Sequence, residues 1–357
     1  MSILLLLAAC GYGIRFARRG EFFSDSFSLS DTRAQKGFFA ICVILHHLCT
    51  YLSDAYPSLF IFEHAGFLAV GGFFLISGYG LQYGVTHRDN YLHGFFRKRF
   101  ATILVPYYII NLFYIASRYI AGALTKKYII LSLFGANLWY VTAILVLYLG
   151  FWLSFRIFGR SGGKYAVTVF CALYAAVLFV CNRFFGASSL GFWWYNSVIC
   201  FVCGIWYCDA KEKIDRFLQK SRIWLFILAA AVFAVTYIAA AKAPDASRVY
   251  VLLYQVVCAG VFCILTAMLA MKIRIGNAFL NLCGDLSLEL YLSHAILIFF
   301  FRSGITVGPY TIYLSSPDFY LTAILVGTLA MSVCVHFVSG KILGLINGGG
   351  KAPVKKA

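Results

Sequence analysis

The stretch DTRAQKGFFAICVILHHL, residues 31–48, carries a lysine and two histidines in a segment that is otherwise strongly apolar. Lys36 and His47 are eleven residues apart, close to three turns of an α-helix, so they share one face, whereas His46 points about 80° away. At about 1.5 Å per residue, His47 lies roughly 16 Å along the helix from Lys36. That is near the middle of a hydrocarbon core about 30 Å thick, and a histidine at this depth is typical of a functional site.

The composition of the whole chain indicates an integral membrane protein. Of 357 residues, 62% are hydrophobic and only 12% are charged, and the mean hydropathy is +0.84. A soluble protein carries about 25% charged residues and could not bury so much apolar surface in one core. The net charge of +17 does not indicate nucleic-acid binding, because the basic residues form short clusters between apolar runs, as membrane topology signals do.

Apolar runs long enough to cross a bilayer predict an all-α polytopic transmembrane bundle of about ten core helices. A further short helix is predicted near the N-terminus, where the LAAC sequence at residues 7–10 is disfavoured as a cleavage site because no Lys or Arg precedes the apolar core. We expect three parts: a short apolar helix with an amphipathic lead-in (1–30), the transmembrane domain (31–345) and a basic tail (346–357). The runs are centred at 36–54, 66–85, 101–121, 137–157, 165–181, 190–208, 223–241, 249–271, 281–301 and 319–341.

The distribution of basic residues predicts the orientation. If the first core helix runs outward, the loops on the cytoplasmic side and the tail hold 23 of the 30 Lys and Arg residues. This is the bias that the positive-inside rule describes. We therefore expect a multi-pass protein of the cell membrane with a cytoplasmic C-terminus.

Five segments, in order along the chain, carry a resemblance to a known family. They are the Lys36 to His47 spacing, GFLAVGGFFLISGYGL with Phe73, Phe74, Ser77, Gly78 and Tyr79, FFRKRFATILVPYY with Arg97, Lys98, Arg99 and Pro106, LWYVTAILVLYL around Trp139, and GDLSLELYLSHAIL around His294. Together they resemble the membrane acyltransferase family 3. Two features depart from the family pattern: Lys36 replaces the usual arginine, and a second arginine expected near Thr102 is missing.

The resemblance implies an O-acyltransferase that moves an acetyl or other short acyl group from cytoplasmic acetyl-CoA or another acyl-CoA to a hydroxyl of a surface glycan, lipid-linked sugar or exported molecule. A neutral imidazole is suited to remove the hydroxyl proton, so His47 is the predicted general base. A covalent acyl-histidine is the alternative. Lys36 joins His47 in the catalytic set, and Lys36, Arg97, Lys98 and Arg99 are predicted to bind the coenzyme phosphates.

The acceptor site is predicted from polar residues on neighbouring helices. Ser287, Tyr291 and His294 share a helix face by i, i+4, i+7 spacing, and Glu289 is the most deeply placed acid. Asn111 belongs to a polar stripe on the helix that follows the basic loop, and Ser77 comes from the second motif. We assign Glu289, His294, Tyr291, Ser77 and Asn111 to substrate binding, with hydrogen bonds between helices as the alternative for each.

Two other functions are compatible with a polar membrane interior. The first is a secondary transporter or flippase of a sugar or lipid-like substrate, which would use the same residues as a proton relay. The second is a non-catalytic protein that senses acyl-CoA. No metal is predicted, because Cys200 and Cys203 form a lone C-x-x-C inside an apolar run, where packing is the usual role. The spacing of Gly80 and Gly84 predicts a close helix contact, and the oligomeric state is not indicated.

Overall fold

The computed structural model describes residues 2–346 except 53, 55, 121, 188, 244–247, 304, 308–309 and 313–315. These residues form thirteen α-helices, two 3₁₀ helices and two small antiparallel sheets, so the predicted all-α architecture is confirmed. The helices are α1 (Ser2–Gly11), α2 (Leu29–Leu52), α3 (Gly66–His87), α4 (Phe95–Ile120), α5 (Lys126–Leu133), α6 (Trp139–Phe184), α7 (Ile199–Asp209), α8 (Lys211–Lys220), α9 (Arg222–Lys242), α10 (Arg248–Ala270), α11 (Ala278–Asp285), α12 (Ser287–Ser303) and α13 (Pro317–Ile346). The 3₁₀ helices are η1 (Pro57–Phe62) and η2 (Phe192–Trp194), and the strands are β1 (Arg15–Phe16) paired with β2 (Ile273–Arg274), and β3 (Ile305–Val307) paired with β4 (Tyr310–Ile312).

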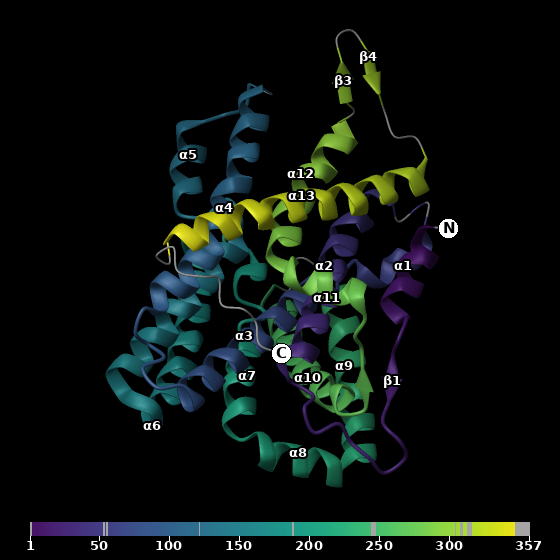
Figure 1. Cartoon of the computed structure of the whole chain (residues 1–357). Helices are drawn as coiled ribbons and strands as arrows, with labels where there is room; N and C mark the ends of the chain where they lie inside the picture. Colours follow the sequence, from purple (N-terminus) through teal and green to yellow (C-terminus); the bar gives the residue numbers. More distant parts are fainter. Residues whose placement is uncertain are drawn as a thin grey trace.

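The long helices form one bundle, with the β3–β4 hairpin and α8 at opposite ends (Figure 1). Among the described residues, six helices are long and apolar enough to span a membrane, and the α11–α12 pair, bent by 81°, is a seventh if counted as one span. Two predicted runs differ from simple spans. α2 carries Lys36 and two histidines, which lower its hydropathy. The run 190–208 is divided between η2 and the eleven-residue α7, which ends one residue later at Asp209. A kink at Gly159, whose φ is 65°, separates the two predicted runs inside α6.

α2 is capped at its N-terminal end by Ser28. The Ser28 hydroxyl accepts the backbone N–H of Asp31 at 3.1 Å and donates to the Asp31 carboxylate at 2.9 Å, so one exposed backbone donor of the first turn is satisfied. α2 begins at Leu29, before the apolar run expected from residue 36, and His47 lies close to its C-terminal end at Leu52.

Two pairs of glycines bring helices into direct backbone contact. A Cβ on Gly37 of α2 would lie 2.1 Å from the carbonyl oxygen of Leu280 in α11, and one on Gly284 would lie 1.9 Å from that of Arg33. Gly78 of α3 and Gly204 of α7 form the equivalent pair. Only glycine permits such approaches. The predicted pair does not act this way, since Gly80 has no atom within 4 Å of its Cβ position and Gly84 faces the ring of Tyr91 in the loop after α3.

Polar contacts hold α12 against its neighbours. Ser293 of α12 and Ser332 of α13 share a hydrogen bond of 3.0 Å between two buried hydroxyls. The Tyr114 hydroxyl of α4 donates to the carbonyl oxygen of Leu292 at 3.2 Å. At the start of α12, Arg33 of α2 forms an ion pair with Asp285 of α11. These contacts fix the helix that carries Glu289, Tyr291 and His294.

Candidate active site

A polar cavity of about 320 Å³ lies between α2, α3, α4, α6, α12 and α13. Four predicted site residues from three sequence segments line it together: Lys36, Ser77, Glu289 and Tyr291. The lining is rich in polar and ionisable groups that a membrane interior excludes unless they serve a wet site. The remaining lining residues are Phe73, Thr102, Ile103, Pro106, Tyr140, Ile144, Tyr148, Gly284, Asp285, Ser287, Leu288, His336, Ser339, Gly340 and Leu343.

The polar cavity contains a histidine that the sequence analysis missed. The Nδ1–H of His336 in α13 donates to Oε1 of Glu289 at 2.9 Å. The Glu289 side chain is 7% exposed, whereas that of His336 is 53% exposed. A signal for this histidine was present in the sequence, because Thr328, Ser332 and His336 recur every four residues along an otherwise apolar helix. That spacing could not show that the partner of His336 is Glu289 on another helix.

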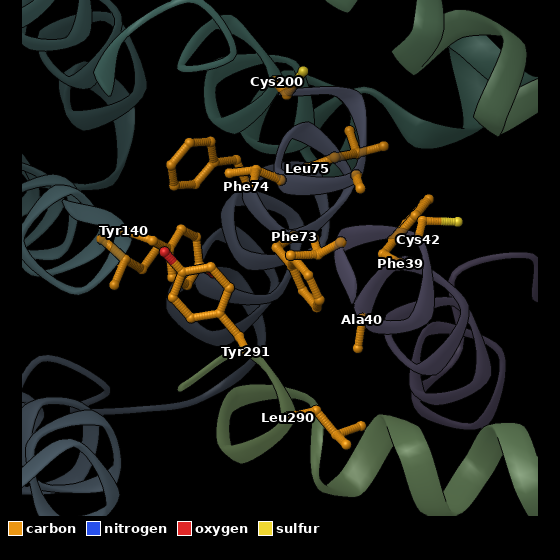
Figure 2. Close-up of a cluster of buried hydrophobic side chains, with 14 of the residues drawn as sticks. Phe39, Ala40, Cys42, Phe73, Phe74, Leu75, Tyr140, Cys200, Leu290 and Tyr291 are labelled. Atoms are coloured by element: carbon orange, nitrogen blue, oxygen red, sulfur yellow. The ribbon is translucent and has the colours of Figure 1, made fainter. Parts of the chain in front are cut away.

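Aromatic rings close the inner end of the polar cavity. The rings of Tyr140 in α6 and Tyr291 in α12 have centroids 4.9 Å apart, and Phe73 of α3 lies 6.1 Å from Tyr140. Figure 2 shows these side chains meeting among α3, α6 and α12. We call Phe73, Tyr140 and Tyr291 the aromatic layer. Tyr291 also approaches His294, with ring centroids 5.8 Å apart, so the layer connects the polar cavity to a second group of residues.

That second group is a histidine cluster made of His46, His47 and His294. The His47 ring lies 5.0 Å from that of His46 and 4.9 Å from that of His294. The side chain of His47 is exposed, and among the described residues the lining of the polar cavity does not include it. The predicted base therefore lies outside the described lining of the cavity that contains Lys36, and the two regions are linked through Tyr291 and His294.

Backbone carbonyls fix the tautomers of the other two histidines. His294 is buried, and its Nδ1 lies 3.2 Å from the carbonyl oxygen of Leu290, while Nδ1 of His46 lies 2.9 Å from that of Phe62. A carbonyl can only accept, so each Nδ1 carries a hydrogen and each neutral ring keeps a lone pair on Nε2. Nε2 of His294 is buried and has no hydrogen-bond partner among the described residues. His46 also packs against Gly66, where a Cβ would lie 2.4 Å from its ring.

The three basic residues predicted to bind phosphate do not act as one group. Arg97 lines a cleft of about 640 Å³ together with Arg88, Arg156 and Arg160, beside the Gly159 kink of α6. We call this the arginine cleft. Lys98 is exposed. The other three arginines of the cleft, Arg88, Arg156 and Arg160, belong to the basic clusters that predicted the orientation, and they come from the end of α3 and the kink of α6.

Arg99 instead turns toward the protein interior. Its Nη2 donates to the hydroxyl of Tyr91 at 2.6 Å. Burial raises the pKa of Tyr91, an effect that the Arg99 charge partly offsets, so the phenol stays protonated and the guanidinium keeps its full charge. Arg99 is thus held between the arginine cleft and the polar cavity by a neutral partner.

Asn111 is a predicted substrate-binding residue that the described lining of the polar cavity does not include. It is buried in α4, and its Oδ1 has no hydrogen-bond partner among the described residues. Within the same described residues, no group of three or more His, Cys, Asp and Glu side chains could hold a metal ion.

Comparison with known proteins identifies the family. A family model described as an acyltransferase domain, that of acyltransferase family 3, matches residues 34–337. No curated protein and no solved structure matches the chain. The matched region extends from the first turns of α2 through most of α13, and so includes the polar cavity, the aromatic layer and the histidine cluster. The chain therefore belongs to acyltransferase family 3 and is a multi-pass membrane acyltransferase.

Proposed function

We propose that the protein is an O-acyltransferase that moves an acetyl or short acyl group from cytoplasmic acyl-CoA to a hydroxyl of a surface glycan, a lipid-linked sugar or an exported molecule. One observation carries this proposal. Tyr291 lines the ionisable cavity and its ring lies 5.8 Å from that of His294, which in turn lies 4.9 Å from the ring of the exposed His47. A donor held in the cavity can then meet an acceptor held at the histidine cluster.

The donor site follows α3, α4 and α6. The arginine cleft and the polar cavity use successive turns of these three helices, and Ile144 of the cavity is twelve residues, or about 18 Å, from Arg156 of the cleft. An elongated coenzyme suits two sites at this spacing. Arginines bind phosphates through paired hydrogen bonds, so the cleft holds the nucleotide phosphates, and the acyl thioester reaches the aromatic layer past Arg99. Lys36, Ser77 and Glu289 then contact the donor end of the reaction.

His47 removes the proton of the acceptor hydroxyl. A neutral imidazole is a suitable base, and the exposed ring of His47 is open to an incoming hydroxyl. The unpartnered lone pair on Nε2 of His294 accepts a hydrogen bond either from the N–H of His47 or from the acceptor. Tyr140 and Tyr291 must separate for the acyl carbon to reach this hydroxyl, so their contact opens once in each turnover.

Purified protein in lipid nanodiscs tests this proposal with acetyl-CoA as the donor probe. We expect release of the coenzyme thiol to depend on an added extract of surface glycans, and mass spectrometry to find acetyl esters on the sugars. His47→Ala should abolish both signals, whereas His46→Ala should retain part of them. Undiminished glycan acetylation by the His47→Ala variant would disprove the catalytic assignment, and movement of glycans without thiol release would favour a transporter.

A further inference from the structure

We propose that His336 is a second catalytic residue, the acid that protonates the departing thiolate of coenzyme A, with Glu289 as its positioning residue. This inference rests on the proposed function, because it assigns the proton on the donor side of the same reaction. It concerns a pair that joins two helices, α12 and α13, inside the polar cavity.

The geometry of the pair suits a proton donor. The hydrogen bond from Nδ1–H of His336 to the carboxylate of Glu289 fixes the ring and leaves Nε2 to carry the second proton. The ring of His336 is half-exposed and lines the polar cavity, whereas Glu289 is almost fully enclosed. When the ring carries a second proton, the Glu289 carboxylate lies beside it as the counter-charge. The pair therefore combines a ring that borders the cavity with a fixed orientation.

The reaction needs such a donor because its two proton transfers occur in different places. His47 takes the hydroxyl proton at the histidine cluster, but the negative charge develops on sulfur inside the polar cavity. An unprotonated thiolate in a partly desolvated cavity is costly. The other charged groups that line the cavity are Lys36 from α2 and Asp285 from α11, and Asp285 is already paired with Arg33. Lys36 can attract the thiolate, but its ammonium is a weaker acid than an imidazolium.

The step balances as follows. The hydroxyl oxygen forms a bond to the acyl carbon while its proton passes to His47. The carbon–sulfur bond breaks, the electron pair stays on sulfur, and the sulfur takes the proton from Nε2 of His336. His336 then regains a proton from water, and His47 returns one to water, so the net products are an ester and a free thiol.

A one-atom change in the donor tests this role. Acetyl-CoA and its selenium analogue, acetyl-seleno-CoA, have the same shape, but a selenol is a far stronger acid, so a selenolate leaves without being protonated. We expect His336→Gln to slow transfer from acetyl-CoA by about 100-fold and transfer from the selenium donor by less than about threefold. Glu289→Gln, which keeps an oxygen to accept the Nδ1–H, should show the same pattern with a smaller loss. His87→Gln, an exposed histidine stacked on Tyr83, is the matched control and should change neither rate.

The outcomes separate this inference from the proposed function. Equal losses with both donors in a monodisperse variant that still binds coenzyme A would overturn the acid role, as would no loss with either. If His336→Gln does not yield monodisperse protein, His336→Asn is measured in the same way. Failure of the proposed function has a different signature, because the wild-type protein would then transfer no acyl group to glycans from either donor, whereas failure of the acid role leaves wild-type transfer intact.

Discussion

The polar cavity and the histidine cluster both contain histidine, but they provide it with different neighbours. His336 in the polar cavity donates to a buried carboxylate, whereas His294 and His46 in the cluster donate to backbone carbonyls. The hydrogen-bond acceptor that holds the ring is an ionisable carboxylate in the first region and a neutral carbonyl in the second. In our proposal this difference separates the histidine that gives a proton from the group that takes one.

The largest expected effect comes from the cluster. His47→Ala should lower the rate of acyl transfer by about 1000-fold, since it removes the proposed base. The affinity for acetyl-CoA should stay within about twofold, because His47 lies outside the described lining of the polar cavity. Thiol-release rates and calorimetric titration with acetyl-CoA measure the two quantities. A parallel loss of affinity would show that the two regions are not separate.

His294→Leu should lower the rate constant by about 100-fold, because the lone pair on Nε2 beside His47 is lost. The KM for acetyl-CoA should not change. His46→Gln is the matched control within the cluster, and it should cost only about fivefold, the value of one backbone hydrogen bond. Steady-state kinetics with varied donor distinguish the two. If His46→Gln were the more damaging change, the tautomer argument for His294 would be wrong.

Lys36→Met should raise the KM for acetyl-CoA by about tenfold with little change in the rate constant, since one charged contact to the donor is lost. Lys36→Arg restores the residue usual in the family and should bind the donor at least as tightly, because a guanidinium makes paired contacts with a phosphate or carboxylate. A fall in the rate constant with an unchanged KM would indicate that Lys36 acts in the chemical step and not in donor binding.

The smallest effect is on stability. Ser28→Ala removes the hydroxyl that caps α2 and should lower the free energy of unfolding by about 1 kcal/mol, while Ser28→Thr should keep most of it. Thermal unfolding in nanodiscs measures the change. Both variants should keep wild-type kinetics, because the cap is at the opposite end of α2 from His47. Loss of activity at unchanged stability would mean that the start of α2 takes part in the site.

Much of this architecture could be predicted from the chain alone. The apolar runs indicated helices in lipid. Helical phase placed Lys36 and His47 on one face of α2, but the polar cavity is lined by Lys36, Ser77 and Glu289 and not, among the described residues, by His47. The arginine cleft could not be predicted, because its members come from the end of α3, the start of α4 and the kink of α6. The close glycine contacts were also misjudged, since Gly78 rather than Gly80 meets another backbone. Spacing shows which residues share a helix face, not which helix covers that face.

The sequence by itself determined that this protein is an all-α membrane acyltransferase, because lipid forces apolar segments into helices and the motifs lie within single segments. Only the tertiary structure decided that Glu289 pairs with His336, 47 residues away, and that the rings of Tyr140 and Tyr291 meet in the cavity that contains Lys36. Hydrophobic periodicity shows which residues of one helix share a face, whereas hydrogen-bond partners and cavities depend on how different helices cross. The chemistry of the site depends on those crossings.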